Sequence, residues 1–423
     1  MISALLMIVF VLGYTAIALE HTLQLNKAAS ALITGVLCWT IYILQSDNTH
    51  TVGEELLHHL GETASILFFL LGAMTIVELI DSHNGFDIIT ERIKTSSKAT
   101  LLLIIATLTF FLSALLDNLT TAIVMTSLCS KILAEKEDRL WFAGIIIIGA
   151  NAGGAWSPLG DVTTTMLWIG GQITALNIMK QLILPSLVAC IIPALIIAYR
   201  FKGTTIAEMP RSVSTLKEKK DGKIVLLAGI GFLVFVPIFK TVTHLPPFMG
   251  MLLALGLMWV ITTVIHKNKG PEIAESFTVA RALQRVDSPS ILFFLGILLA
   301  VAALQSFGLL GNLATFLSST LKNDYYIGIV LGLLSAIVDN VPLVAASQGM
   351  YDLSVYPTDH PFWEFLALTT GTGGSAIIIG TAAGVAVMGI EQIDFMWYLK
   401  KIGWLALAGF AGGILVFLLQ MQL

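Results

Sequence analysis

The chain has 423 residues and a formal net charge of −4; 56% of its residues are hydrophobic and 12% are charged. Its mean hydropathy is +0.88, which excludes a soluble globular protein, because such a protein needs a larger polar share to cover its surface. We therefore expect an integral membrane protein that is surrounded by lipid and that binds neither nucleic acid nor an organic cofactor.

Apolar runs of nearly transmembrane length occur from the first residues of the chain to the last. They cover residues 2–19, 28–44, 64–80, 224–239 and 402–419. About 20 apolar residues cross about 30 Å of hydrocarbon as a helix, so the predicted fold class is an all-α integral membrane protein. The first run starts at Met1 without a preceding basic residue or a small-residue cleavage site, which favours a retained span over a signal peptide.

The basic residues predict the orientation in the membrane. Lys and Arg gather in alternate connections, namely Lys27, Arg92 to Lys98, Lys131 to Arg139, Arg200 to Lys223, Lys267 to Arg285, and Lys400 with Lys401. Such connections are cytoplasmic by the positive-inside rule. Residues 47–62 and 349–364 contain neither Lys nor Arg. Both termini of this multi-pass protein are therefore expected in the periplasm, with the chain in a bacterial inner membrane.

Segment 99–131 is bounded by basic residues on both sides, so both of its ends are expected on one face of the membrane. Its two apolar arms are too short for two crossings and too long for one. We therefore predict a re-entrant hairpin with Asp117 at its tip, a turn that membranes tolerate only beside protein or a water-filled cavity. Segment 325–351 repeats the arrangement, with Asp339 at the tip and its ends on the opposite face.

Parts of the first half of the chain recur in the second half in the same order. Residues 66–70, 113–118 and 151–160 match residues 291–295, 335–340 and 371–380. The predicted charge sidedness gives the two halves opposite orientations, which is the plan of an inverted-repeat secondary transporter. We expect repeat 1 at residues 1–200, a cytoplasmic linker at 201–223 and repeat 2 at 224–423.

Each predicted repeat also contains a broken transmembrane helix, at residues 141–172 and 364–389. The first is interrupted by Gly153, Gly154 and Pro158. Breaks of this kind expose backbone carbonyls at mid-depth and are tolerated where they line a site.

The breaks and hairpin tips are rich in oxygen-bearing side chains. The candidate ion-binding residues are Asp117, Asn118, Thr120, Asn151, Ser157, Asp161, Thr163, Asp339, Asn340, Thr372, Ser375 and Thr381. Those proposed to ligate Na⁺ directly are Asp117, Asn118, Asn151 and Asp161. No Lys or Arg is expected at the same depth, and carboxylate, amide and hydroxyl oxygens together suit a hard cation. The competing interpretation is that each Asp only caps a helix at a polar turn.

Other titratable residues gather near the predicted cytoplasmic ends of the helices. Candidates for pH sensing are Glu20, His21, Glu78 and His83. The competing interpretation for all four is an ordinary solvated place at the membrane interface, although His titrates near neutral pH.

Two motifs carry a resemblance to a known family. Residues 116–121 read Leu-Asp-Asn-Leu-Thr-Thr, and residues 153–164 read Gly-Gly-Ala-Trp-Ser-Pro-Leu-Gly-Asp-Val-Thr-Thr. With the early Leu-Glu-His at residues 19–21, they make the chain resemble the ion transporter superfamily, and most closely the NhaD family of Na⁺/H⁺ antiporters. The superfamily also includes arsenite permeases and Na⁺-coupled dicarboxylate transporters, whose hairpin tips carry Ser-Asn-Thr. Here Asp117 and Asp339 replace that Ser, which disfavours a carboxylate substrate.

The resemblance implies paired hairpins, two broken helices and a homodimer in which a transport domain moves against a scaffold by an elevator-like mechanism. The function expected is secondary Na⁺(Li⁺)/H⁺ antiport serving pH homeostasis, in which cation and protons compete for the intramembrane aspartates. Na⁺ or Li⁺ and H⁺ are the transported ions, and no cofactor is expected. An arsenite or dicarboxylate transporter of the same superfamily is the alternative. An intramembrane enzyme is disfavoured because no Ser-His pair or metal-ligand motif is apparent at mid-depth.

Overall fold

The computed structural model describes residues 2–46, 48–86, 88, 95–206, 216–267 and 277–422, with the side chains of residues 2, 21, 22 and 216–219 excepted. This part of the chain is built from helices and contains no β-strand. Eight of its helices are long and apolar enough to cross a membrane. The prediction of an all-α membrane protein is thus confirmed. Residues 207–215 of the predicted linker and residues 89–94 and 268–276 of the basic connections lie outside the described residues.

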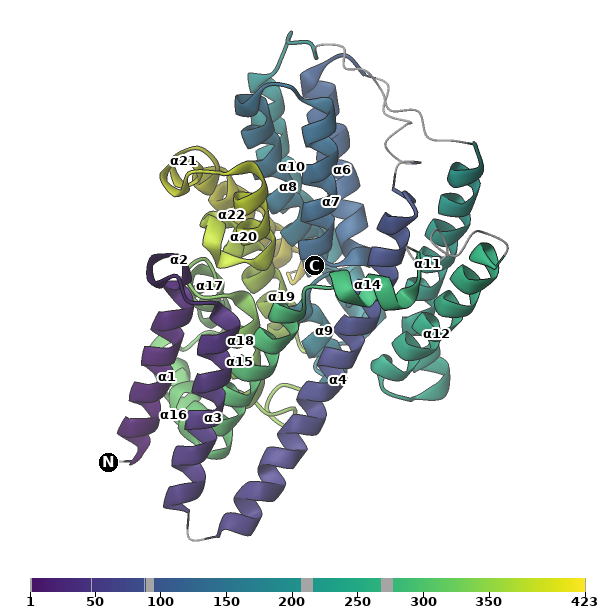
Figure 1. Ribbon diagram of the computed structural model, residues 1–423. Coiled ribbons are helices and arrows are strands. Elements are labelled where there is room, and N and C mark those ends of the chain that lie inside the picture. Colours follow the sequence, from purple (N-terminus) through teal and green to yellow (C-terminus); the bar gives the residue numbers. More distant parts are fainter. Residues whose placement is uncertain are drawn as a thin grey trace.

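Contacts between helices divide the molecule into two bundles (Figure 1). The first bundle consists of α1 (Ile2–Ala18), α3 (Lys27–Gln45), α4 (Thr49–Ser82), α11 (Leu216–Thr243), α12 (Pro247–His266), α15 (Ser288–Ser306) and α16 (Leu309–Leu321), with the short α2 (Glu20–Leu23) and α14 (Val279–Arg285). Helix α15 packs against α3 and α4, and α4 in turn packs against α12.

The second bundle contains the elements for which the sequence predicts breaks. It consists of α6 (Lys98–Leu116), α7 (Asn118–Ile132), α8 (Lys136–Ala155), α9 (Val162–Ile169), α10 (Ala175–Arg200), α17 (Asp324–Leu334), α18 (Asn340–Met350), α19 (Pro361–Gly373), α20 (Ala382–Glu391), α21 (Phe395–Tyr398) and α22 (Trp404–Gln420). In Figure 1 the upper ends of α6, α8 and α10 extend well beyond α2 and α14 of the first bundle.

Four interruptions give the second bundle its shape. Helices α6 and α7 meet at Asp117, and residues 335–339 separate α17 from α18. Residues 156–161 separate α8 from α9, and two short 3₁₀ turns fill residues 374–380 between α19 and α20. The helices therefore stop where the sequence predicts breaks; that these segments form re-entrant hairpins and inverted repeats stays a prediction.

Helix α4 differs from the expected pattern. The sequence analysis treats residues 47–62 as a connection, whereas the structure makes all of Thr49–Ser82 one helix of 34 residues. Asn48 caps its start by accepting a hydrogen bond from the Thr51 N–H. Side-chain contacts one helical turn apart, His50 with Glu54 and His58 with Glu62, support the polar part of the helix. A polar stretch thus continues the helix beyond its apolar section.

Helices α9 and α18 of the second bundle contact α4 and α15 of the first. One polar contact crosses this boundary from α11: the Lys240 Nζ donates a hydrogen bond to the Trp168 carbonyl at 2.8 Å and lies 4.7 Å from the centre of the Trp168 ring. Because Trp168 is near the end of α9, the ammonium also meets the negative end of that helix.

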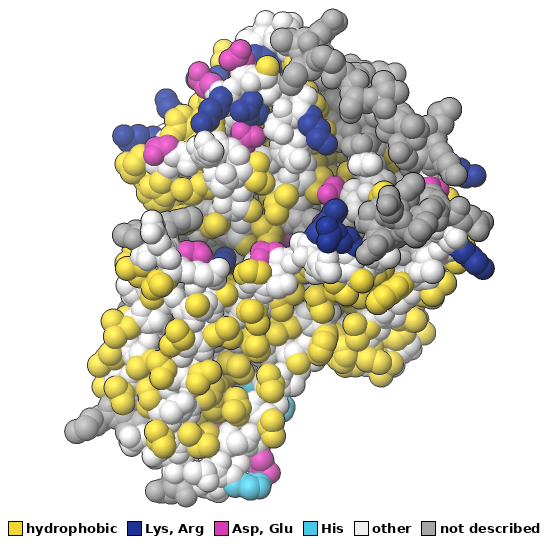
Figure 2. All heavy atoms as spheres, viewed as in Figure 1, with side chains coloured by type: hydrophobic (Ala, Val, Ile, Leu, Met, Phe, Trp, Pro, Cys, Tyr) yellow, Lys and Arg dark blue, Asp and Glu magenta, His cyan; other side chains and the backbone are white. Residues whose placement is uncertain are grey.

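The outer surface of the first bundle is largely apolar. Figure 2 shows apolar side chains spread over this bundle, while Lys and Arg gather toward the upper end of the molecule and near the level of α14. Trp259, Val260 and Val264 of α12 are among the exposed apolar residues. Such a surface suits contact with lipid and not with water.

Candidate ion-binding site

Both predicted hairpin tips use their aspartate to start the following helix. Asp117, at φ 72°, accepts hydrogen bonds from the Thr120 N–H and hydroxyl, each at 2.8 Å. The Asp339 carboxylate accepts one from the Val341 N–H at 3.2 Å. Each side chain is thus a helix N-cap, as the competing interpretation of these residues expects. The Asp339 carboxylate accepts one hydrogen bond and that of Asp117 accepts two, so Asp339 has more lone pairs left for another ligand.

Asp161 lies where the two halves of the chain converge. Its side chain caps α9 by accepting from the Thr163 N–H and hydroxyl, both at 2.9 Å. The Asn118 amide donates to its other oxygen at 2.6 Å, and the Asn340 amide donates to the same oxygen at 3.2 Å. Asp161 is only 2% exposed. Within the described residues, only neutral groups donate to this buried carboxylate.

Asn151 extends this network into the second half of the chain. Its carbonyl oxygen accepts from the Asn118 amide at 3.0 Å. Its own amide nitrogen donates to the Ser375 hydroxyl at 2.9 Å and to the Thr381 hydroxyl at 3.1 Å. All four side chains are buried. We refer to Asn118, Asn151, Asp161, Thr163, Asn340, Ser375 and Thr381 as the Asp161 network.

Corresponding positions in the two halves make corresponding contacts. The Ser113 hydroxyl donates to the Ala150 carbonyl at 2.5 Å, and the Ser335 hydroxyl donates to the Thr370 carbonyl at 3.0 Å. Asp161 caps α9 with φ −148° and ψ 149°, and Thr381 caps α20 with φ −144° and ψ 153°. The backbone is therefore nearly the same at the two caps, but only one cap carries an ionisable side chain.

Two glycines allow the helices around the breaks to approach closely. A Cβ atom on Gly153 would lie 2.2 Å from the Phe110 carbonyl oxygen, and one on Gly373 would lie 2.1 Å from the Gly332 carbonyl oxygen. In each half, the interrupted helix thus packs against the helix that leads to the predicted tip. Any larger residue would force two backbones apart.

Five predicted site residues lie outside the Asp161 network: Asp117 and Asp339 at the predicted tips, and three residues with hydroxyl side chains. Ser157 donates to the Ala114 carbonyl at 2.5 Å and accepts from the Leu159 N–H, so it shapes the break after α8. Thr120 binds Asp117, and Thr372 donates to the Leu368 carbonyl of its own helix at 2.6 Å. These hydroxyls have roles in local structure.

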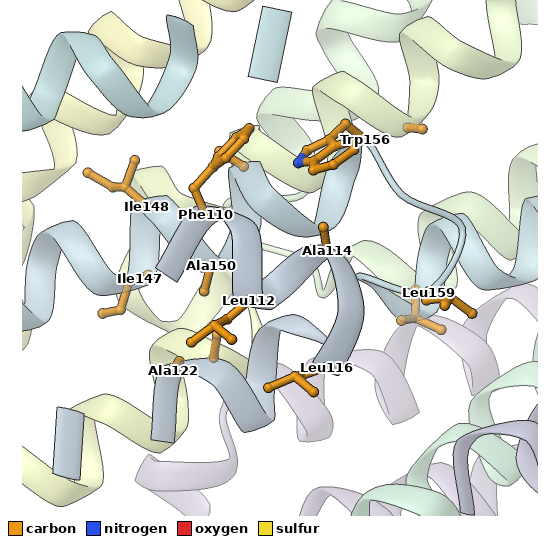
Figure 3. Packing of buried hydrophobic residues seen from close by; sticks show 14 of the residues in the cluster. Phe110, Leu112, Ala114, Leu116, Ala122, Ile147, Ile148, Ala150, Trp156 and Leu159 are labelled. Atoms are coloured by element: carbon orange, nitrogen blue, oxygen red, sulfur yellow. The ribbon is translucent and has the colours of Figure 1, made fainter. Parts of the chain in front are cut away.

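Trp156, at the end of α8, packs on α6. Its ring stacks on Phe110 with centroids 5.8 Å apart and an interplanar angle of 18°. Its edge contact with Phe111 is 6.4 Å between centroids. Figure 3 shows the Phe110 and Trp156 rings side by side, above the apolar side chains of Ala114 and Leu116. The indole therefore anchors the break between α8 and α9 to the neighbouring helix.

The candidates for pH sensing do not join the Asp161 network within the described residues. Glu78 accepts from Arg285 at 3.2 Å. His83 is buried, with its Nε2 atom 2.8 Å from Nε2 of His266. Glu20 accepts from the Lys27 backbone N–H at 3.1 Å. The side chain of His21 lies outside the described part.

The sequence analysis missed Lys27 as a neighbour of the site. It assigns Lys27 to a cytoplasmic connection, yet the structure gives Lys27 and Asp339 a shared cavity. The physical reason is that Lys27 opens α3 beside an apolar run, where a surface position is ordinary. That Lys27 lies next to the partly buried acid Asp339 becomes apparent only when α3 and the tip before α18 are brought together.

Comparisons with known proteins give a consistent family. A family described as citrate transporter (CitMHS) matches residues 2–371. Sodium/proton antiporter 1 of Arabidopsis thaliana is 45% identical over 412 residues, or 97% of this chain and 71% of that protein. Sodium/proton antiporter 2 of the same plant is 42% identical, covering 97% of this chain and 98% of its own. The Na⁺/H⁺ antiporter NhaD of Vibrio cholerae is 32% identical, and the match covers 98% of this chain and 91% of that protein.

The relatives and the family are transporters, and their names contain no enzyme activity. The similarity extends over nearly the whole chain and includes both the first and the second bundle. The chain therefore belongs to the citrate transporter family, and its similarity to the NhaD antiporters also makes it a member of their family.

Proposed function

We propose that this protein is a secondary Na⁺(Li⁺)/H⁺ antiporter in which the cation and protons compete for Asp161. The observation that carries the proposal is the buried Asp161 carboxylate, which receives hydrogen bonds from neutral groups only, within the described residues. An uncompensated carboxylate is costly in a membrane, so it is most stable when it holds a cation or a proton. Two ions that neutralise the same group exclude each other, which is the requirement for exchange.

The surrounding side chains can serve a bound cation. The amides of Asn118, Asn151 and Asn340 each have a carbonyl oxygen, which a half-turn about the last side-chain bond directs to where the nitrogen was. The hydroxyls of Ser375 and Thr381 add further oxygens. Carboxylate, amide and hydroxyl oxygens are the ligands that hard cations prefer. Asp117 and Asp339, at the predicted tips, are proposed as further titrating carboxylates.

The transport cycle we propose uses the two bundles. Ser113 and Ser335 make equivalent hydrogen bonds in the two halves, and Asp161 and Thr381 are equivalent helix caps. Both correspondences support a duplicated, inverted pair of repeats. The second bundle would then be the mobile transport domain and the first the scaffold. Movement is allowed only when Asp161 is neutralised. A homodimer in a bacterial inner membrane, with both termini in the periplasm and a role in pH homeostasis, completes the proposal.

Transport of citrate or a dicarboxylate is the second candidate, because the matching family is described as citrate transporter. The Asp161 network opposes it. A site for an organic carboxylate needs a cation or a set of N–H donors, whereas this network centres on an acid.

The deciding experiment uses proteoliposomes containing a trapped pH dye and no citrate. Added external Na⁺ or Li⁺ should make the interior more alkaline, because entering cations drive protons out; choline should not. The Asp161→Asn protein serves as the matched control. No pH change with wild-type protein would refute the proposal, and uptake of labelled citrate in a parallel set would favour the second candidate.

A further inference from the structure

A cavity lined by both polar and apolar side chains lies at the tip before α18, next to Asn340 of the Asp161 network. It has a volume of about 50 Å³ and is lined by Tyr14, Glu20, Lys27, Phe293, Ile337 and Asp339, among others. A cavity of this size holds a few water molecules. Tyr14, Glu20, Lys27 and Phe293 come from the first bundle, whereas Asp339 belongs to the second. The cavity is therefore part of the boundary between the bundles.

The Lys27 ammonium lines this cavity, is held there by an aromatic ring and forms no salt bridge within the described residues. Its Nζ atom lies 4.7 Å from the centre of the Phe293 ring, a cation–π contact that fixes the ammonium without neutralising it. The backbone N–H of the same residue donates to Glu20 at 3.1 Å. Within the described residues Lys27 forms no salt bridge, yet it lies close enough to Asp339 for the two charges to interact.

Asp339 has acceptor capacity to spare toward the cavity. Its carboxylate accepts only the Val341 N–H from the described residues, whereas that of Asp117 accepts two donors from Thr120. Tyr14 supplies an independent sign of a missing ligand. Its hydroxyl is buried, lies beside the backbone of Asp339 and makes no hydrogen bond of good geometry within the described part of the chain. A buried, unsatisfied hydroxyl normally binds water or an ion.

We propose that this cavity is a second subsite for a small monovalent cation, with Asp339 as its acidic ligand and Lys27 as a tethered competitor. When the subsite is empty, the positive Lys27 ammonium partly neutralises the negative Asp339 carboxylate through intervening water. An arriving Na⁺ or Li⁺ takes that place, with oxygens from Asp339, Tyr14 and water, and no covalent bond changes. The inference rests on the proposed function and deepens it, because it gives the two halves unequal sites.

The competition predicts a gain of affinity when the ammonium is removed. Lys27→Met keeps the apolar stem against Phe293 but removes the charge. In proteoliposomes, the Na⁺ concentration for half-maximal exchange should fall about 5-fold, as expected for two unit charges that interact through water. Lys27→Arg should restore a wild-type value. Lys223→Met, which removes an exposed Lys of α11, is the matched control and should change nothing.

A second measurement does not depend on turnover. Na⁺ should stabilise the detergent-solubilised protein against heat, because it binds the folded state, and the midpoint of this effect should shift by the same factor in Lys27→Met. In the Asp339→Asn background the Lys27→Met shift should vanish. An unchanged midpoint in Lys27→Met, or an equal shift with and without Asp339, would overturn the inference. Wild-type protein that exchanges no Na⁺ for H⁺ would instead refute the proposed function.

Discussion

At the scale of single residues, Asp161 is surrounded by groups that can change roles. The Asn118 and Asn340 amides present nitrogen to the carboxylate in this structure, and after a half-turn they present oxygen. The same side chains can therefore stabilise the charged acid alone and ligate a cation beside it. Because the surrounding donors are neutral, a proton can replace the cation on Asp161, and the buried carboxylate is then neutralised by either ion.

Substitutions at the two matching caps should have unequal effects. Asp161→Asn keeps the side-chain volume but removes the charge, so Na⁺-driven exchange should fall to the background of empty liposomes while expression stays normal. Thr381→Ala removes one neutral hydroxyl, a loss of about 1 kcal/mol, and should raise the half-saturating Na⁺ concentration about 5-fold. Flux assays across Na⁺ concentrations make the comparison. A larger loss for Thr381→Ala than for Asp161→Asn would place the main site in the second half.

Sequence reasoning selected members of the Asp161 network as candidates, but it did not reveal how these residues connect. Asp161, Asn118 and Asn151 could be found because a charged or amide side chain in an apolar, glycine-broken segment has few other reasons to be there. The bond between Asn340 and Asp161, which are 179 positions apart, leaves no pattern in spacing. The nearness of Lys27 to Asp339 was hidden for the same reason.

At the scale of elements, the breaks in the second bundle depend on backbones that nearly touch. Gly153 of α8 faces the Phe110 carbonyl of α6 across a gap that has no room for a methyl group. The sequence could predict that the helices break, because Gly, Pro and Asp-Asn leave local signals. It could not predict that α4 continues through a polar stretch, since a solvated helix and a loop have similar compositions.

Gly153→Ala should therefore destabilise the protein. The new Cβ would lie 2.2 Å from a backbone oxygen, and overpacking of this kind costs about 1–3 kcal/mol. We expect a lower apparent Tm in detergent, followed by fluorescence or by loss of a monodisperse peak. Gly256→Ala in α12 is the control, because nothing lies within 4 Å of its Cβ and Ala favours a helix. Equal Tm values for both variants would contradict the packing argument.

At the scale of the whole molecule, the arrangement of two bundles is plain, while its orientation in the membrane comes from charge alone. Contacts within each bundle far outweigh those between them, and the apolar outer surface suits lipid. The prediction of opposite orientations for the two halves depends on the basic residues, several of which lie outside the described part of the chain.

Thiol labelling can test this orientation. Lys136, at the start of α8, and Asp352, after α18, are both exposed. A Cys at position 136 should react with a membrane-impermeant reagent only from the cytoplasm, and a Cys at position 352 only from the periplasm. The native Cys38, Cys129 and Cys190 are buried and provide a low background. Labelling of both positions from one side would overturn the inverted arrangement.

The contact between Lys240 and Trp168 has a consequence for the resting equilibrium of the molecule. If the second bundle moves, this hydrogen bond and cation–π contact break in every cycle, and together they are worth about 1–2 kcal/mol. Lys240→Met should therefore reduce the population of the present arrangement about tenfold relative to the other. The end of the Gln305 side chain of α15 lies beside Gly349 of α18. A short bifunctional thiol reagent that links Gln305→Cys to Gly349→Cys would therefore report that population through its rate of cross-linking. Slower cross-linking in Lys240→Met is expected, and an unchanged rate would mean that this lysine does not bias the occupancy of the two arrangements.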